Sequence, residues 1–139
     1  MFSETITRND LKAILDSALP STAVDYIVEQ GTDGDWTYRK WNSGIAECWG
    51  TKSESKALSS WGSWYYVRID GIDYPTNLFT TLLNVTGSLQ WAGGDLVSGL
   101  TTRPSAYNVT APHAIGIRPN NLSGTDSATA FWYAVGKWK

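Results

Sequence analysis

Residues 36–50 constrain the fold of this chain more than any other stretch. Their middle, Asn-Ser-Gly at 42–44, combines residue types that accept a positive φ at little cost, which predicts a tight turn. Aromatic side chains pack well on a pleated surface, and each buries a large area when it faces a core. Three tryptophans lie within the stretch: Trp36, Trp41 and Trp49. The stretch therefore predicts an aromatic-rich β-hairpin.

Short runs of strand-forming residues, separated by turn signals, continue to the end of the sequence. We expect strands at 26–30, 61–69, 82–91 (with a break at Gly87), 114–118 and 128–138, a loop or polar edge strand at 51–60, and a short irregular piece at 96–102. In the last strand both faces are apolar, with Phe131, Tyr133 and Val135 on one and Trp132, Ala134 and Trp138 on the other. Such a strand is central in a sheet or covered by a neighbouring subunit. The pattern predicts an all-β, antiparallel β-sandwich.

Residues 6–19 carry the helical pattern of the chain. Thr7 and Asp10 resemble a capping box with Asp in place of Glu, and Ile6 and Leu11 occupy the positions of a hydrophobic staple. Apolar residues recur at 11, 14, 15 and 18, and Pro20 ends the pattern. A helix this short needs a partner. It either packs on its own domain, or it is a neck or anchor to a larger assembly, so we expect two parts, 1–24 and 25–139.

Composition narrows the function classes. The 139 residues suit one domain with a real core. Charged residues make up 17% and aromatics 13%, which fits a β domain that buries surface between subunits or shows aromatics to a ligand. The net charge of −2 comes without a basic run, so we expect no nucleic-acid partner. No apolar run has the length of a membrane span, and no apolar signal core is visible near residue 1. We therefore expect synthesis in a cytoplasm and no membrane insertion.

The usual catalytic and metal-binding residues are scarce. His113 and Cys48 are the one histidine and the one cysteine, whereas zinc sites gather several such residues. No G-x-S-x-G nucleophile motif occurs. Five aspartates lie in turn-like contexts, where backbone roles are more common than a glycosidase pair: Asp33, Asp35, Asp70, Asp73 and Asp95. We therefore expect no enzyme activity, no metal and no cofactor.

The aromatic cluster at 61–66 gives the candidate binding site. Strand alternation places Tyr65, Val67 and Ile69 on one face and Trp64, Tyr66 and Arg68 on the other. One of these faces belongs to the core. The other face is also buried, forms a subunit interface, or stacks on sugar rings. In the last case, polar neighbours orient the hydroxyl groups of the sugar. The candidate ligand-binding residues are Trp61, Trp64 and Tyr66, with Asp95 or Arg103 as polar partners.

Three segments carry a resemblance to a known family. Residues 38–50 form a basic-aromatic strand, a Ser-Gly turn and a strand ending in Trp-Gly, and 130–139 contain Phe-Trp-Tyr-Ala-Val-Gly. Between them, 74–79 (Tyr-Pro-Thr-Asn-Leu-Phe) resemble a Phe-Pro-x-x-Phe bend. These segments resemble the C-terminal knob domains of phage and prophage tail-fibre or minor structural proteins, which are distantly similar to H-type lectins. The resemblance spans about 26–139, is loose over 80–125 and excludes 1–24.

The resemblance implies an antiparallel β-sandwich knob that works as a homotrimer in a virion, beside other virion proteins. We expect a tail-fibre tip that binds a glycan of the bacterial surface without catalysis. Two alternatives stay open: a purely structural trimerising cap or capsid decoration, and, more weakly, an envelope polysaccharide depolymerase. A depolymerase needs a placed carboxylate pair.

Overall fold

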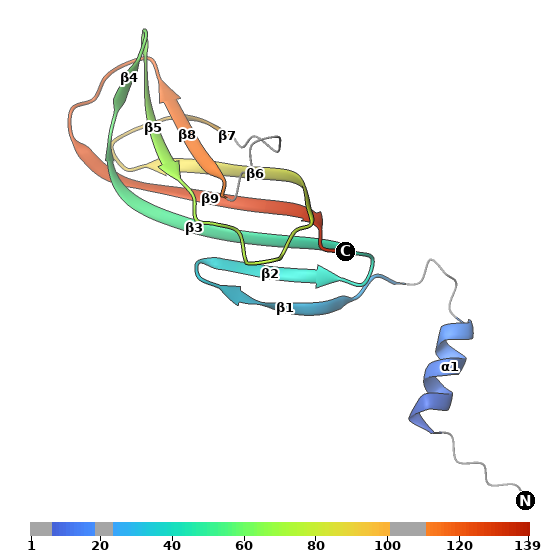
Figure 1. The fold of residues 1–139 in the computed structure, drawn as a ribbon. Coiled ribbons are helices and arrows are strands. Elements are labelled where there is room, and N and C mark those ends of the chain that lie inside the picture. The colour runs from blue at the N-terminus through green and yellow to red at the C-terminus, as the bar shows by residue number, and fades with distance from the viewer. Residues whose placement is uncertain (1–6, 19–23, 101–110) are drawn as a thin grey trace, which may run out of the picture.

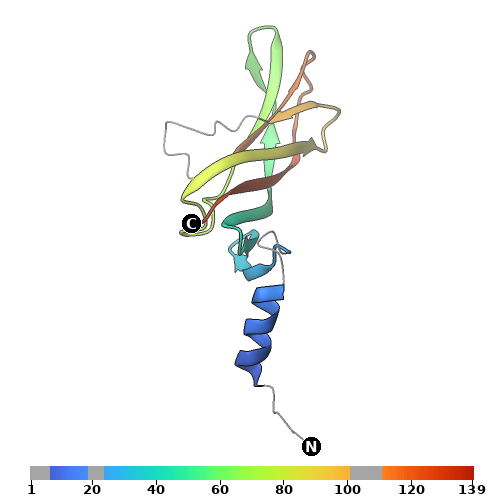
Figure 2. The ribbon, with the colours of Figure 1, turned by 90° about the vertical axis from the view of Figure 1, so that its right-hand side faces the viewer.

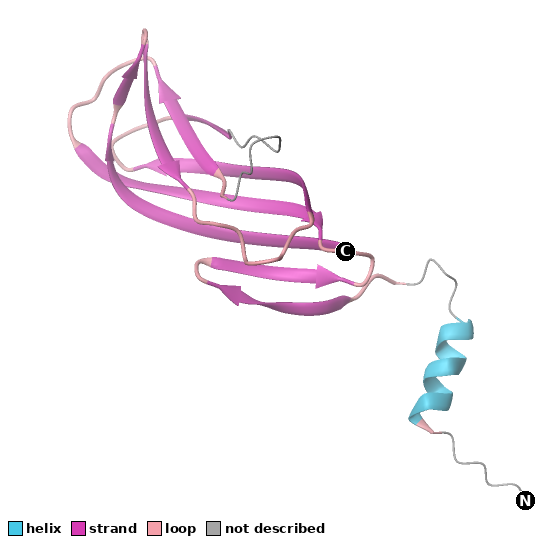
Figure 3. Cartoon of the chain, viewed as in Figure 1, coloured by secondary structure: helices cyan, strands magenta, loops and turns pink. Residues whose placement is uncertain are grey.

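A computed structural model describes residues 7–18, 24–100 and 111–139. These residues form one short helix and two antiparallel sheets (Figures 1 and 3). The larger sheet has the order β1-β2-β3-β9-β6 and the smaller one β4-β5-β8-β7. The elements are α1 (Arg8–Ala18), β1 (Ile27–Asp33), β2 (Trp36–Trp41), β3 (Ile45–Ala57), β4 (Ser59–Trp61), β5 (Trp64–Asp70), β6 (Thr81–Trp91), β7 (Val97–Leu100), β8 (His113–Arg118) and β9 (Thr125–Lys137). The expected antiparallel β fold with one N-terminal helix is confirmed.

The predicted hairpin of 36–50 is β2 and the first half of β3. Gly44 has a φ of 96° and its N–H donates to the Trp41 carbonyl at 3.0 Å, which closes the turn. Beyond Gly50, the register of β3 continues against β9 alone among the described strands. Residues 51–57 are thus a polar edge strand, one of the two alternatives, on which Lys52 and Lys56 each lie 2.6 Å from Glu54.

The single strand expected at 61–69 is wrong, because the chain reverses within it. Trp61 ends β4, Gly62 and Ser63 turn, and Trp64 begins β5. Gly62 has a φ of 61°, the positive value that glycine supplies at the first central position of a type II′ hairpin turn. The break expected at Gly87 is also wrong, since β6 runs through it and is irregular at Leu82–Asn84 instead. The piece expected to be irregular at 96–102 contains the regular strand β7.

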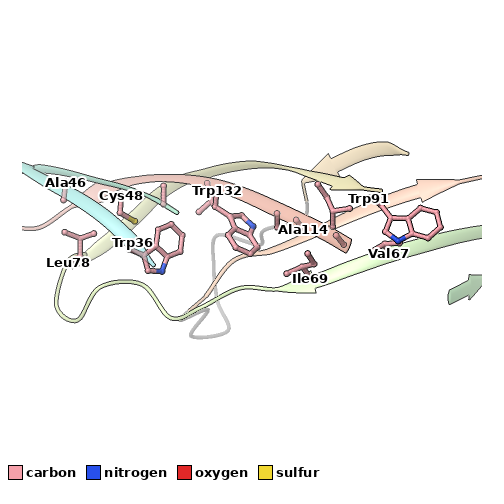
Figure 4. Close-up of a cluster of buried hydrophobic side chains, with 14 residues drawn as sticks. Trp36, Ala46, Cys48, Val67, Ile69, Leu78, Trp91, Ala114 and Trp132 are labelled. Atoms are coloured by element: carbon pink, nitrogen blue, oxygen red, sulfur yellow. The ribbon is translucent and has the colours of Figure 1, made fainter. Parts of the chain in front are cut away.

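One core cluster takes side chains from both sheets (Figure 4). Val67, Ile69 and Ala114 come from the smaller sheet. The larger sheet supplies Trp36, Ala46, Cys48, Val85, Leu89, Trp91, Ala128, Ala130, Trp132 and Ala134. The many alanines on β3 and β9 leave room for the three indoles, so the core is filled by alternating small and large side chains.

A row across the larger sheet shows the same alternation. Trp36 pairs with Gly50, Gly50 pairs with Trp132, and Trp132 pairs with Gly87, across β2, β3, β9 and β6. The two indole rings stand 6.3 Å apart at an angle of 39°. Gly87 thus lies directly opposite the buried Trp132, in the middle of an unbroken strand.

The terminal strand β9 is central in its sheet, between β3 and β6, as one of the two alternatives predicted. Trp132 and Ala134 point into the core, whereas Phe131 and Tyr133 are about 40% exposed on the opposite face. Helix α1 lies apart from both sheets (Figure 2). Its capping box is confirmed, because the Thr7 N–H donates to Asp10 Oδ2 and the Asp10 N–H donates to Thr7 Oγ1. Leu11 and Ile14 are about half exposed.

Candidate functional site

The outer face of the smaller sheet is the candidate site. Val67 and Ile69 point inwards and are buried, so the alternating residues of β5 point outwards. Directly paired residues share a face, which adds side chains from the neighbouring strands. We call this surface the aromatic face; it comprises Ser59, Trp61, Trp64, Tyr66, Arg68, Asp70, Val97, His113, Ile115 and Ile117. The face is rich in exposed apolar groups, as functional surfaces often are.

Trp61 and Trp64 face each other across the two-residue turn between β4 and β5. Their side chains remain 66% and 46% exposed. The β4–β5 hairpin forms one end of the smaller sheet (Figure 1). Both tryptophans are therefore presented on a short, regular hairpin, where their outer faces are open to a ligand.

A hollow of about 190 Å³ lies on this face, lined by Trp61, Tyr66, Arg68 and Ile115. The rings of Trp61 and Tyr66 meet edge to face, at a centroid distance of 6.5 Å and an angle of 79°. The hollow is thus an open recess with two aromatic walls.

Arg68 lines the hollow and is paired with a carboxylate next to it on the same strand. Arg68 Nε and Nη2 each lie 2.6 Å from Asp70 Oδ1, which makes a charge-assisted pair along the outer face of β5. Both side chains are well exposed, at 47% and 70%. Asp70 is the last residue of β5, and its backbone carbonyl accepts from Lys52 Nζ at 2.9 Å.

Of the predicted site residues, Trp61, Trp64 and Tyr66 lie together on the aromatic face, and Trp61 and Tyr66 share the hollow. Asp95 is exposed in the connection between β6 and β7, two residues before Val97, and does not line the hollow. Arg103 lies outside the described residues. Sequence reasoning missed Arg68 and Ile115, which line the hollow, and Asp70, which pairs with Arg68. The alternation of β5 signals Asp70, but nothing local signals Ile115, which reaches the site through β5–β8 pairing.

A second hollow, of about 180 Å³, lies where the 75–78 bend meets β1 and β2. Its polar groups are already paired, because Glu29 accepts from Lys40 Nζ at 2.9 Å and from the Tyr38 hydroxyl at 3.0 Å. The Lys40 and Tyr38 hydrogen bonds lower the pKa of Glu29, and the same bond to Glu29 raises the pKa of Tyr38. Asp33, another member, accepts from the Thr76 N–H at 3.2 Å. The bond between Asp33 and Thr76 therefore joins the β1–β2 hairpin to the bend, and the other two bonds lie within the hairpin.

A second aromatic surface lies on the outer side of the larger sheet. Trp49 pairs with Tyr133, and Arg39 lies 4.9 Å above the Trp49 ring. The Tyr133 hydroxyl donates to Glu47 at 2.6 Å, and this bond raises the pKa of Tyr133 to about 12. Phe131 lies two residues before Tyr133 on the same side of β9. We call this surface the β9 face, defined by Arg39, Glu47, Trp49, Phe131 and Tyr133.

The single cysteine and the clustering of possible metal ligands can be examined in the described residues. Burial raises the pKa of the Cys48 thiol to about 12, so the thiol is protonated near neutral pH and a poor nucleophile. No group of three or more His, Cys, Asp or Glu side chains gathers in the described ranges. Within the same ranges, no helix has both the length and the apolarity that crossing a bilayer requires.

Comparisons with protein-family models, with curated proteins and with solved structures found no match for this chain.

Proposed function

We propose that this chain is a non-catalytic knob of a phage virion appendage that binds a bacterial surface glycan through the aromatic face. In this proposal the two sheets are the halves of a β-sandwich. The resemblance at 38–50 and 130–139 supports it, because these distant segments form β2, β3 and β9, which are neighbours in one sheet. The third segment, 74–79, is the bend that leads from the smaller sheet into β6.

The observation that carries the proposal is the open hollow between Trp61 and Tyr66. The C–H faces of a pyranose ring pack on aromatic rings, and hydroxyls at its edge exchange hydrogen bonds with charged groups such as Arg68 and Asp70. Two tryptophans exposed at a hairpin turn contribute little to the core, and exposed apolar surface of this kind favours a binding role.

The test is an array of glycans from bacterial envelopes, probed with the wild-type chain and with Trp61→Ala. Trp61 is exposed, so its removal leaves the fold intact, which thermal unfolding checks. We expect the variant to lose at least tenfold in affinity, since an aromatic platform contributes on the order of 1–3 kcal/mol per stacked ring.

The matched control is Tyr26→Ala, which removes another exposed aromatic ring that belongs to neither aromatic surface. We expect it to bind like the wild type. Equal binding by all three proteins would reject the aromatic face as the site, and an array without any binding would reject glycan recognition.

The alternative function, a purely structural trimerising cap, is favoured by apolar side chains that are exposed away from the aromatic face. The β9 face exposes Phe131 and Tyr133, and α1 exposes Leu11 and Ile14. We propose that the β9 face joins three copies of the chain and that α1 is a neck or an anchor to other virion proteins. A single sugar site of this size is weak, and three linked sites raise avidity by orders of magnitude. Assembly and recognition thus support each other, whereas a pure cap needs no open aromatic face.

A further inference from the structure

We infer that the aromatic face selects neutral pyranose sugars over acidic ones. The inference rests on the proposed function and adds the class of ligand. It comes from Arg68, which lines the hollow, and its ion-pair partner Asp70, which together offer donors and acceptors of hydrogen bonds without a net charge.

Formal charges on this face are few. Among its described residues, Arg68 and Asp70 are the ones that carry a charge throughout the neutral pH range, and the two cancel. His113 lies opposite Asp70 in the β5–β8 register. Apart from this histidine, the formal charges of the described residues of the face sum to zero.

The pair keeps unused hydrogen-bonding capacity toward a ligand. Both bonds from Arg68 fall on a single carboxylate oxygen, Asp70 Oδ1. They use two of the five guanidinium donors and leave the carboxylate able to accept more. Because the two side chains are about half and more than two thirds exposed, a ligand seated in the hollow can reach them.

Neighbouring sugar hydroxyls suit such a pair. One hydroxyl donates to Asp70 while the next accepts from Arg68, since a hydroxyl does both. A carboxylate or phosphate on the sugar only accepts hydrogen bonds, so it cannot donate to Asp70, and the Asp70 charge cancels the attraction that Arg68 would offer it. The lost hydrogen bond and the uncompensated desolvation of the ligand's charge weaken binding on the order of tenfold.

The test compares oligosaccharides that differ in one group. Gluco-, galacto- and manno-oligomers are paired with their uronic acid counterparts, in which a carboxylate replaces the C6 hydroxymethyl group. Affinities are measured at pH 8, where an ordinary imidazole is neutral. We expect the wild type to prefer the neutral member of any pair it binds by about tenfold.

Asp70→Asn keeps the size of the side chain but leaves the Arg68 charge uncompensated. We expect this variant to shift the ratio of its affinities for the neutral and acidic sugars about tenfold toward the acidic sugar. In 1 M salt, most of this added affinity for the acidic sugar should be lost. The control is Asp35→Asn, which makes the same change in net charge at an exposed position outside the face and leaves the ratio unchanged. Thermal unfolding checks that both variants are folded.

The outcomes separate this inference from the proposed function. If Trp61→Ala abolishes binding but the wild type binds uronic acids as well as neutral sugars, glycan binding stands and the neutral preference is overturned. An unchanged ratio in Asp70→Asn, or an equal shift in Asp35→Asn, also overturns it. If no oligosaccharide and no glycan of the envelope array binds in a Trp61-dependent way, both proposals fail.

Discussion

Trp36 and Trp132 lie on strands that are not neighbours, yet their indole rings stand 6.3 Å apart across Gly50. A side chain at position 50 would fill the space that lets the two rings approach. A Cβ there would lie 2.8 Å from the Asp35 carbonyl oxygen and 2.9 Å from the Trp36 ring. Neither the backbone nor a buried indole can move cheaply.

Gly50→Ala is therefore expected to destabilise the fold by about 1–3 kcal/mol, the usual cost of overpacking. Urea unfolding followed by tryptophan fluorescence measures the change. Thr51→Ala, at the next and exposed position, serves as the control and should stay within about 0.5 kcal/mol of the wild type. A Gly50→Ala variant as stable as this control would contradict the packing argument.

Adjacent residues of β5 should respond differently to truncation. Ile69 is fully buried, and Ile69→Ala is expected to cost about 2–5 kcal/mol through lost burial and a cavity. Arg68 is exposed and its pair with Asp70 is solvated, so Arg68→Ala should cost less than about 1 kcal/mol. Paired denaturation curves test this contrast, which fails if the two variants lose similar stability.

Trp64→Ala should fold, since Trp64 is about half exposed on the outer side of its sheet. Trp64 does not line the hollow, so we expect its loss to weaken host-cell adsorption less than the loss of Trp61. Adsorption assays with Trp61→Ala, Trp64→Ala and Tyr26→Ala should rank in that order of effect. An unfolded Trp64→Ala, or one that adsorbs like the wild type, removes Trp64 from the site.

Alkaline pH should destabilise the wild type through Tyr133. The hydrogen bond to Glu47 raises the folded-state pKa of Tyr133 to about 12, above the ordinary value near 10. The stabilisation is complete below pH 10 and is lost as pH rises from 10 to 12, because the unfolded state loses its proton more readily. Tyr133→Phe should therefore show a shallower decline in unfolding free energy over this range.

Tyr38 and Tyr74 also have raised pKa values, so the wild type and the variant share part of the decline. The difference between their two curves isolates Tyr133. If the unfolding free energies of the two proteins change in parallel between pH 9 and 12, the hydrogen bond from Tyr133 to Glu47 does not contribute to stability.

Assembly is tested at the β9 face. We expect the wild type to be a trimer at micromolar concentration by light scattering, and the double change Phe131→Ser with Tyr133→Ser to make it a monomer. The two side chains point away from the core, so the variant should keep its β circular dichroism. A monomeric wild type would refute the trimer, and a trimeric double variant would move the contacts elsewhere, with Leu11 and Ile14 of α1 as the next candidates.

Local signals predicted most of the elements. The Asn-Ser-Gly turn, the alternation on β5 and β9, and the Thr7–Asp10 capping box are all found in the structure. These features depend on residues close together in the sequence, where steric preference and side-chain period act directly.

The errors and omissions have non-local causes. Gly87 resembles a strand break by itself, but β6 continues through it because the strand pairs with β9, where Trp132 lies opposite Gly87, 45 residues later. Ile115 joins the hollow because β8 pairs with β5 across more than 40 residues. Such pairing depends on the register of whole strands and on the packing of both sheets, which one sequence does not specify locally.

On strand β5, residues that pack in the core alternate with residues that face the solvent. Val67 and Ile69 belong to the core, whereas Tyr66 and Arg68 face outwards. If the outward residues recognise the host, then host range can drift by exchanging every second residue of this strand while the melting temperature barely changes. A library randomised at positions 61, 64, 66, 68 and 70 would then sample new specificities from mostly folded proteins, without any compensating change in the core.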